Sequence, residues 1–335
     1  MRKYDKSNMF YLLKNFPTHC YEGYSYFIPE LNKNFDKIVF TGMGGSAISG
    51  DIIKVLLEEK NKLPVFVIRD YVLPEYVDSN SLLIVESYSG DTEETIATLN
   101  LGLKKNCSIL CVSSNGEIEK ISNKKSIPFI KIPTGMPPRC AFGYLFFPIY
   151  KFFVEKKLLM PLKKSFFKKI QDWVNDFSSI NNNKAIEISK KIYGNFLLIY
   201  SENRFYPGIL RWKTQIAENS KSFSSINVLP EMNHNEIMSF YYPNWLIKKM
   251  FVLFISSGLE NERIKKRIEI TSNIISKKVK EVIEIKLEGD DLFEKLIYLI
   301  VLGDWISYYL AMENKVDPTE IKEIKILKEN MKKGG

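Results

Sequence analysis

Residues 1–154 alternate short apolar runs with amphipathic stretches. The apolar runs are rich in Ile, Val, Leu and Phe, as is typical of strands buried on both faces of a sheet. We expect strands at 37–41, 65–69, 82–86, 108–112 and 129–132. The amphipathic stretches predict helices at 47–58, 93–105 and 140–154. Strands that alternate with helices favour a mostly parallel, doubly wound α/β sheet flanked by helices.

The same alternation returns in the second half of the chain. A charged stretch with a proline, EKKLLMPLKK at 155–164, interrupts the pattern, so the sequence predicts two domains, 1–154 and 155–335. In the second domain we expect strands at 196–200, 251–256 and 282–286. Helices are expected at 207–217, 260–278 and 292–314, before a C-terminal helix. Two domains of similar build suggest a degenerate duplication.

Composition narrows the class of protein. Apolar residues make up 45% of the chain and charged residues 26%, as in soluble globular proteins. The run Ile297–Leu302 is broken by Gly303-Asp304, which argues against a membrane span, and the N-terminus lacks an apolar signal core. We therefore expect a cytoplasmic protein with no membrane partner.

The net charge of +9 comes from dispersed lysines without a nucleic-acid recognition motif. No nucleic-acid partner is expected, although a positive field favours an anionic substrate. The cysteines have neither metal-ligand spacing nor the density of a disulfide scaffold, so buried thiols are expected. They are Cys20, Cys107, Cys111 and Cys140. No metal site is expected.

A glycine-rich turn, TGMGGSAISGD at 41–51, joins a predicted strand to a predicted helix. Gly42-Met43-Gly44-Gly45-Ser46-Ala47 fits the dinucleotide fingerprint G-x-G-x-x-A, but the acidic residue that should follow, Asp70, comes late. No G-K-[ST] follows, which disfavours a nucleoside triphosphate. A dinucleotide-dependent oxidoreductase stays open on this fingerprint alone, and it predicts tight NAD(P) binding.

A second turn, ESYSGDTEET at 86–95, also joins a strand to a helix. Ser87, Ser89 and Thr92 would ordinarily be read as helix caps. In an open parallel sheet, however, this turn lies along the same edge as Gly44, Gly45 and Ser46. Hydroxyl groups at helix N-termini suit a terminal phosphate better than a pyrophosphate. These six residues are the predicted phosphate cradle.

The two turns resemble the paired phosphate-binding segments of sugar isomerase (SIS) domains. More narrowly, they resemble the archaeal-type bifunctional phosphoglucose/phosphomannose isomerases, and the resemblance continues in order along nearly the whole chain. The further matching segments are GMPPRCAFGY at 135–144, RWKTQIAENSK at 211–221, PEMNHNEI at 230–237 and VDPTEIKEIKILK at 316–328. Asp91 and Ala217 depart from this pattern, since Asn is common at both positions, and the extra charge of Asp91 near a phosphate would weaken binding slightly.

This resemblance implies an aldose–ketose isomerase. The enzyme would interconvert glucose 6-phosphate and mannose 6-phosphate with fructose 6-phosphate through a cis-enediol, without a cofactor. An alternative is a SIS module that binds a sugar phosphate without turnover. The segments AENSK and NHNE argue against that alternative, because a sensor needs neither a base nor a proton shuttle.

The resemblance also implies the catalytic residues. Glu218 is the general base, and His234 opens the sugar ring and reaches the site of the neighbouring subunit of a homodimer. Arg139 holds the developing oxyanion. Lys328 is an active-site lysine, with Lys325 as its rival.

Thr319 and His19 differ in how they relate to this pattern. Thr319 lines the pocket in the C-terminal segment of the resemblance. His19 matches no motif and is read as structural.

Overall fold

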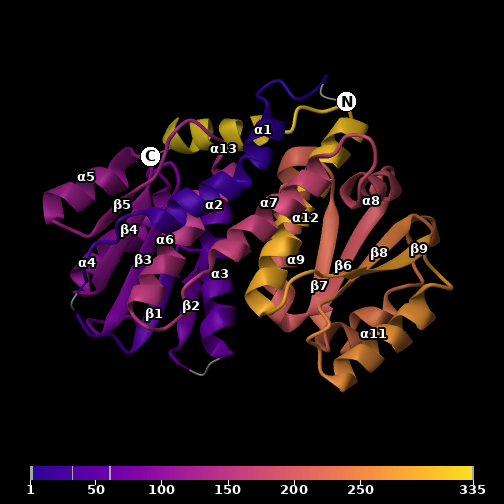
Figure 1. The fold of residues 1–335 in the computed structure, drawn as a ribbon, viewed down its shortest axis with the longest axis horizontal. Helices are drawn as coiled ribbons and strands as arrows, with labels where there is room; N and C mark the ends of the chain where they lie inside the picture. Colours follow the sequence, from indigo (N-terminus) through magenta and orange to yellow (C-terminus); the bar gives the residue numbers. More distant parts are fainter. Residues whose placement is uncertain (1–2, 32, 60–61, 334–335) are drawn as a thin grey trace. The chain divides into compact units, whose positions relative to one another are not determined.

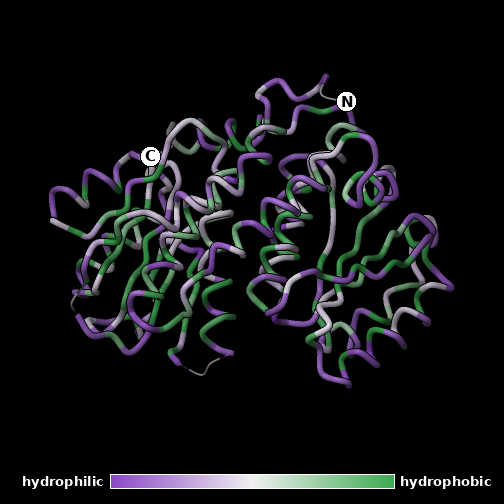
Figure 2. The backbone as a smooth tube through the Cα atoms, in the orientation of Figure 1, coloured by the Kyte–Doolittle hydropathy of each residue, from purple (hydrophilic) through white to green (hydrophobic). Residues whose placement is uncertain are grey.

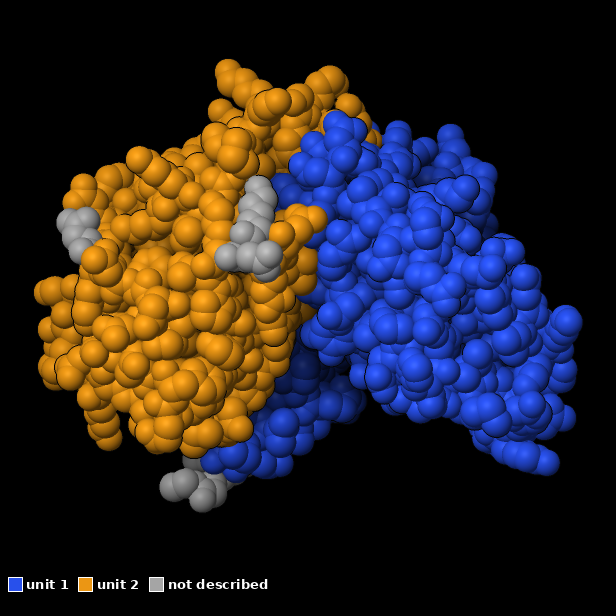
Figure 3. All heavy atoms as spheres, turned by 90° about the horizontal axis from the view of Figure 1, so that it is seen from below, with its two compact units in different colours: residues 1–14, 173–335 blue, residues 15–172 orange. Residues whose placement is uncertain are grey.

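The computed structural model describes residues 3–31, 33–59 and 62–333. Helices and parallel strands alternate along the chain (Figure 1). The chain forms two compact units, coloured separately in Figure 3. Residues 15–172 are called the N-terminal unit, and residues 1–14 with 173–335 are called the C-terminal unit.

The N-terminal unit contains a five-stranded parallel sheet of order β2-β1-β3-β4-β5. Every residue of β3 and β4 is buried, because helices cover both faces of the sheet. The strands are β1 (Lys37–Thr41), β2 (Val65–Ile68), β3 (Ser81–Ser87), β4 (Ser108–Ser113) and β5 (Phe129–Lys131).

Helices α4 and α5 cover one face of this sheet and pack on a cluster that includes Val39, Leu83 and Leu99. Helices α3 and α6 cover the other face, where Phe40 meets Phe153 of α6. Figure 2 shows the apolar strands inside more hydrophilic helices. The helices are α2 (Phe16–Ser25), α3 (Gly45–Glu58), α4 (Glu93–Lys104), α5 (Gly116–Lys125), η1 (Pro138–Cys140), α6 (Phe142–Glu155) and α7 (Lys164–Ser178), which contributes to both units.

The C-terminal unit contains a four-stranded parallel sheet of order β7-β6-β8-β9. This order corresponds to β2-β1-β3-β4 of the first sheet, as a duplication would produce. The strands are β6 (Phe196–Glu202), β7 (Ser224–Leu229), β8 (Met250–Ser256) and β9 (Glu281–Lys286).

Helix α11 packs on one face of this second sheet, and α9 packs with α12 and α8 on the other. The helices are α1 (Met9–Lys14), α8 (Lys184–Ile192), η2 (Asn203–Phe205), α9 (Tyr206–Ser220), η3 (Glu231–His234), η4 (Glu236–Met238), α10 (Asn244–Ile247), α11 (Glu262–Ile275), α12 (Leu292–Glu313) and α13 (Lys322–Lys333).

Helix α12 is the central core helix of the C-terminal unit. By length and composition it could cross a membrane, but 94% of its most apolar window is buried inside the protein. Asp304 in its middle accepts hydrogen bonds from Arg211 Nε at 3.0 Å and Nη2 at 2.7 Å. A Cβ on Gly303 would lie 2.1 Å from Trp212 Nε1, so only glycine allows α9 to approach so closely. This packing explains a mid-helix glycine and a buried carboxylate.

The expected strands and helices are all present, and their ends differ from the expected ends by at most three residues. Strand β7 and helices α1, α2, α5, α7, α8 and α10 were not predicted from the pattern. β7 is an edge strand whose four middle residues are only partly buried, so its sequence lacks a continuous apolar run.

The boundaries of the compact units do not coincide with the expected boundary at 154/155. Residues beyond 155 continue to pack in the N-terminal unit, where Leu162 N–H donates to Tyr24 Oη at 3.0 Å. At the other end, Tyr308 Oη donates to Asp5 at 3.2 Å and Phe10 packs edge-on against Trp305. The first residues of the chain therefore belong to the C-terminal unit.

Candidate active site

The turn after β1 brings the start of α3 against the end of β3. Gly44 has a φ of +52°, which favours glycine, and α3 begins at Gly45. A Cβ on Gly42 would lie 2.7 Å from the carbonyl oxygen of Glu86. Ser46 is nearly buried in the first turn of α3. The glycines thus allow a close backbone approach between the two predicted phosphate-binding segments.

The turn after β3 is ordered by its own hydroxyl groups. Ser87 Oγ and Thr92 Oγ1 are 2.9 Å apart, and Gly90 N–H donates to Ser87 Oγ at 3.2 Å. Asp91 N–H donates to Ser89 Oγ at 3.3 Å. Gly90 has a φ of +71°, and a Cβ there would lie 1.7 Å from Asn115 O. Three hydroxyl groups are therefore held at the start of α4.

Neither helix at these turns is capped by a side chain within the described part of the chain. The N-cap residues are Gly44 for α3 and Thr92 for α4, and the hydroxyl of Thr92 pairs with Ser87 instead of capping. Helices α2, α6 and α9 also lack a side-chain cap, whereas Asn261 caps α11 and Asp291 caps α12. Open N–H groups at a helix start are donors for an anion. The hydroxyl of Thr92 is therefore engaged within the turn and does not cap α4.

A third segment of the N-terminal unit adjoins the same turn. Met136 N–H donates to Tyr88 Oη at 2.9 Å, and η1, which carries Arg139, packs against α3. The Arg139 side chain is 4% exposed. The structure thus brings the segment 135–140 next to Tyr88 and to α3.

Asp91 has a local role that the sequence pattern did not show. Its Oδ1 accepts the N–H of Glu117 at 2.9 Å, in the first turn of α5. A negative charge is favourable at a helix N-terminus. Asp91, which departs from the family pattern, therefore accepts a hydrogen bond from the first turn of α5. Helix α5 was not predicted from the sequence.

Glu86 is a buried carboxyl group next to the cradle that sequence reasoning missed. The side chain is 1% exposed, and Ser49 Oγ donates to its Oε1 at 2.9 Å. Its Oε2 has no hydrogen-bond partner among the described residues. Burial raises the pKa of Glu86 well above its ordinary value. The contact links the end of β3 to α3, three residues after Ser46.

In the C-terminal unit, most of the motif RWKTQIAENSK packs α9 against α12. Arg211 and Gln215 both donate to Asp304, and Asn219 Nδ2 donates to Ser307 Oγ at 2.9 Å. Glu218 lies in the last turn of α9 and is only partly buried. The motif therefore fixes α9 and leaves this carboxylate accessible.

Lys221 joins the end of α9 to the C-terminal segment. It ends the helix with a φ of +53°, and its Nζ donates to Glu218 O at 2.8 Å and to Asp317 O at 2.6 Å. Thr319 N–H donates to Asp317 Oδ1 at 2.8 Å. Thr319 and Glu218 thus belong to one connected region.

The two candidate lysines follow on α13. Lys325 and Lys328 are both exposed there, so their burial does not distinguish them.

His234 is an exposed side chain on a well-anchored turn. Before it, Asn233 Nδ2 donates to Thr271 Oγ1 of α11 at 2.7 Å. After it, Glu236 accepts hydrogen bonds from Tyr200 Oη, at 2.7 Å, and from Asn227 Nδ2. The motif NHNE therefore fixes the backbone on both sides and presents the imidazole to the surface.

The structure does not bring Glu218 and His234 together within one chain. Helix α9 leads into the amino end of β7, whereas η3 follows its carboxyl end. A strand of six residues spans about 20 Å at roughly 3.3 Å per residue. Two groups at opposite ends of this strand are too far apart to act on one hexose.

His19 and the cysteines were expected to be structural residues. His19 is buried, its ring centroid lies 4.8 Å from that of Tyr144, and burial lowers its pKa. Three of the cysteines are buried, and Cys107 is partly buried. Among the described residues, no cluster of His, Cys, Asp and Glu could hold a metal ion.

Comparisons with known proteins agree with this architecture. Residues 31–129 match the SIS domain family, and residues 181–331 match the bacterial phospho-glucose isomerase C-terminal SIS domain. The C-terminal domain of glucosamine-fructose-6-phosphate aminotransferase from Francisella tularensis has a similar fold, with a TM-score of 0.70, 16% identity and coverage of 93% of this chain and 98% of that chain. The molecule is thus an α/β protein with two SIS domains.

Relatives with higher identity define the family. The bifunctional phosphoglucose/phosphomannose isomerase of Caldicellulosiruptor bescii is 34% identical, over 96% of this chain and 98% of that protein. The protein of the same name from Aquifex aeolicus is 34% identical, over 88% of this chain and 90% of its own length. The chain belongs to the family of bifunctional phosphoglucose/phosphomannose isomerases.

Proposed function

We propose that this protein interconverts glucose 6-phosphate and mannose 6-phosphate with fructose 6-phosphate through a cis-enediol. The observation that carries the proposal is the pair of uncapped helix starts, α3 and α4, surrounded by serine and threonine hydroxyls. The relatives named above act on phosphorylated hexoses according to their names. A sugar-phosphate substrate accounts for both the phosphate cradle and the isomerase family.

Phosphate binding is assigned to the N-terminal unit. Gly44 and Gly45 provide backbone N–H donors at α3, and Ser46 provides a hydroxyl, since its own N–H donates to Met43 O at 3.1 Å. Ser87, Ser89 and Thr92 provide hydroxyls at α4. A phosphate at two helix N-termini is stabilised by the open N–H groups and by the helix dipoles. The phosphate anchors the substrate while the other end of the sugar reacts.

Isomerisation requires ring opening and then proton transfer between C2 and C1. His234 is proposed to open the ring, because an imidazole can donate and accept protons near neutral pH. Glu218 then removes the carbon-bound proton. Arg139 stabilises the enediolate oxygen, with Lys328 and Thr319 completing the site. Glucose 6-phosphate and mannose 6-phosphate give the same enediol, so one base serves both substrates.

The separation of Glu218 and His234 along β7 supports a homodimer with shared sites. Beyond His234, the chain exposes several large apolar side chains that a second copy would cover. They are Met238, Tyr241, Tyr242 and Trp245, with exposed fractions of 69%, 55%, 86% and 69%. In this proposal, His234 of one subunit acts in the site that contains Glu218 of the other.

We also propose a cytoplasmic role in glycolysis and gluconeogenesis, where fructose 6-phosphate is formed and consumed.

A coupled assay with both aldose phosphates tests the proposal. The parent protein should convert fructose 6-phosphate into both products, and Glu218→Gln should lose about 10²–10⁴-fold in kcat for the two reactions alike. In deuterated water, the parent should place deuterium at C2 of the aldose phosphate and the variant should not. Glu187→Gln, an exposed glutamate of α8, is the control.

Three outcomes would contradict the proposal. Binding of fructose 6-phosphate without turnover would indicate a sensing module. Tight NAD(P) binding would indicate the dinucleotide alternative. Loss of only one of the two activities in Glu218→Gln would mean that the two reactions use separate bases.

A further inference from the structure

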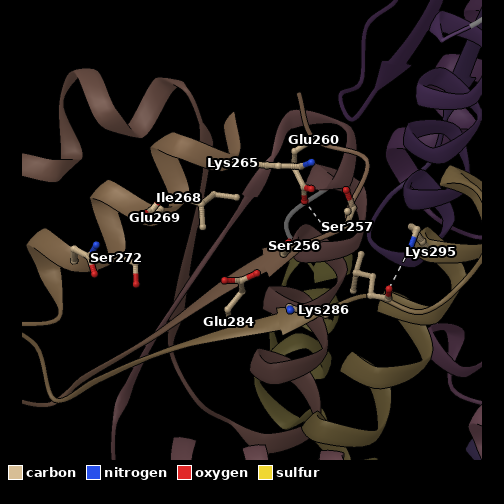
Figure 4. Close-up of a pocket in the computed structure, with 13 residues that line it drawn as sticks. Ser256, Ser257, Glu260, Lys265, Ile268, Glu269, Ser272, Glu284, Lys286 and Lys295 are labelled. Carbon is tan, nitrogen blue, oxygen red and sulfur yellow. Dashed lines mark hydrogen bonds between the residues drawn. The ribbon is translucent and has the colours of Figure 1, made fainter. Parts of the chain in front are cut away.

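The second sheet has a cavity of about 630 Å³ at its carboxyl edge (Figure 4). The proposed isomerisation does not use it. The cavity is formed by the turn after β8, by α11 and by the end of β9, with one residue of α12. Ligands of open parallel sheets bind at this edge.

The turn after β8 is the counterpart of the cradle turn after β3. The strand orders correspond, and Gly258 has a φ of +76°, close to the +71° of Gly90. Its donors, however, are already used. Ser257 N–H donates to the Glu260 carboxylate, and Ser257 Oγ donates to Glu202 Oε1 at 3.0 Å. The Glu260 carboxylate therefore already accepts the Ser257 N–H that a bound anion would need. The side chain of Asn261 caps α11, so the start of that helix is also occupied.

Glu260 is the buried polar group of this cavity. Its side chain is 4% exposed and lines the cavity, and its Oε2 has no hydrogen-bond partner in the described ranges. Glu202 beside it is 7% exposed and pairs with Arg204 at 2.9 Å, and burial raises its pKa although the Arg204 charge opposes the rise. A buried carboxylate oxygen is stabilised by a donor. Glu260 therefore has a carboxylate oxygen that can accept from an O–H or N–H group.

The rest of the lining mixes acceptors and donors, with Glu269 and Glu284 beside Lys265, Lys286 and Lys295. Glu269, Ser272 and Glu284 contribute oxygen atoms from α11 and β9. Two of the lining lysines are engaged, since Lys265 Nζ donates to Glu262 at 2.9 Å and Lys295 Nζ donates to Leu287 O at 3.1 Å. The lining, with equal numbers of glutamates and lysines, therefore matches an uncharged ligand whose groups both donate and accept hydrogen bonds, as hydroxyl groups do.

We propose that this cavity is a second ligand site, which binds a small polyhydroxylated molecule without a phosphate group, such as a free sugar or sugar alcohol. In this proposal the Glu260 carboxylate accepts a ligand hydroxyl. The volume is within the usual range of small-molecule sites and leaves room for water beside a hexitol. The inference does not depend on the proposed isomerase activity.

Calorimetric titration with sorbitol tests this site on the full chain. Glu260→Gln keeps an oxygen to accept from Ser257 N–H but replaces Oε2 by a donor. Sorbitol should bind the parent and the Glu187→Gln control equally, and should bind Glu260→Gln about tenfold or more weakly. Glu284→Gln, on an exposed position of β9, should also weaken binding, and it tests the site without changing the turn after β8.

Other results would overturn the proposal. They are no sorbitol binding to the parent, binding to both glutamine variants as tight as to the parent, or displacement of sorbitol from this site by inorganic phosphate. Loss of sorbitol binding in Ser89→Ala with retention in Glu260→Gln would assign the sugar to the first sheet instead. The isomerase assay on the same proteins reports separately on the proposed function.

Discussion

Glu218 and His234 lie at opposite ends of β7 in the same chain. The glutamate precedes the amino end of the strand in the last turn of α9, and the histidine follows the carboxyl end in η3. Both belong to segments that the family resemblance assigns to the active site. Because a single hexose cannot reach both ends of the strand, the two residues act together only if they come from different copies of the chain.

Mixing two inactive variants should therefore restore activity. Glu218→Gln and His234→Ala each remove one group from every site of their own homodimer. After subunit exchange, half of the dimers are mixed and each has one intact site of two, so activity should return to about a quarter of the parent value. The coupled assay with fructose 6-phosphate measures this recovery.

The double variant Glu218→Gln/His234→Ala is the matched control, because mixing it with either single variant creates no intact site. Exchange itself is followed by mass spectrometry of differently tagged subunits. If mixed dimers form and the mixture stays inactive, Glu218 and His234 do not complement each other across subunits.

Removing cradle hydroxyls should weaken substrate binding without unfolding the protein. In Thr92→Ala, the lost hydroxyl pairs with Ser87 and does not cap α4, so the Tm should change little. A lost hydrogen bond to a charged phosphate should raise the KM roughly 10- to 100-fold, with a smaller effect on kcat. Ser276→Ala at the end of α11 is the control. An unchanged KM in the double variant Ser89→Ala/Thr92→Ala would place the phosphate elsewhere.

The Arg211–Asp304 pair should be important for stability. The side chains are 2% and 7% exposed, and Gln215 also donates to Asp304. Asp304→Ala leaves the guanidinium buried without this carboxylate and should lower the free energy of unfolding by about 3–5 kcal/mol in urea denaturation. The exposed pair Lys168–Asp172 is the comparison, and Asp172→Ala should cost about 1 kcal/mol or less. Similar losses in both variants would contradict this assignment.

The buried strands were predictable because each is a short continuous run of apolar residues. The large helices were predictable because their sequences are amphipathic. Strand β7 was not, since its sequence SSINVL lies at the edge of the sheet and is half solvated. Helix α5 was missed for a similar reason: only Ile118 and Ser122 are buried in it, and its start depends on Asp91, 26 residues from Glu117. Such a tertiary cap leaves no local signal.

The sequence motifs identified which residues form the candidate site. They did not predict how the side chains of these residues contact one another. The hydroxyls of the turn after β3 could be listed from sequence, but only the structure separates Thr92 from an ordinary cap. Glu86 looked like the end of an apolar strand, since nothing local showed that its side chain is buried against Ser49 of α3. The separation of Glu218 from His234 depends on β7, the strand that the apolar pattern did not reveal.

Glu86 should make the stability of the protein depend on pH. Burial raises the pKa of its carboxyl group in the folded state above the ordinary value of 4.5. Above about that pH, the unfolded chain releases a proton that the folded chain retains. Stability from this group is therefore full below the unfolded pKa and is lost as the pH rises toward the folded pKa.

Glu86→Gln should remove this dependence. The amide oxygen can still accept from Ser49 Oγ, and the side chain stays neutral at every pH. We expect the variant to be more stable than the parent at neutral pH and the difference to shrink toward pH 4, measured by urea denaturation across the range. Glu58→Gln, at the half-exposed end of α3, should show no such trend.

The difference in the free energy of unfolding between Glu86→Gln and the parent could instead stay constant with pH, or grow as the pH falls. Either result would mean that Glu86 is ionised in the folded protein. The KM for fructose 6-phosphate should change little in Glu86→Gln, because the amide keeps the shape of the side chain and its contact with Ser49.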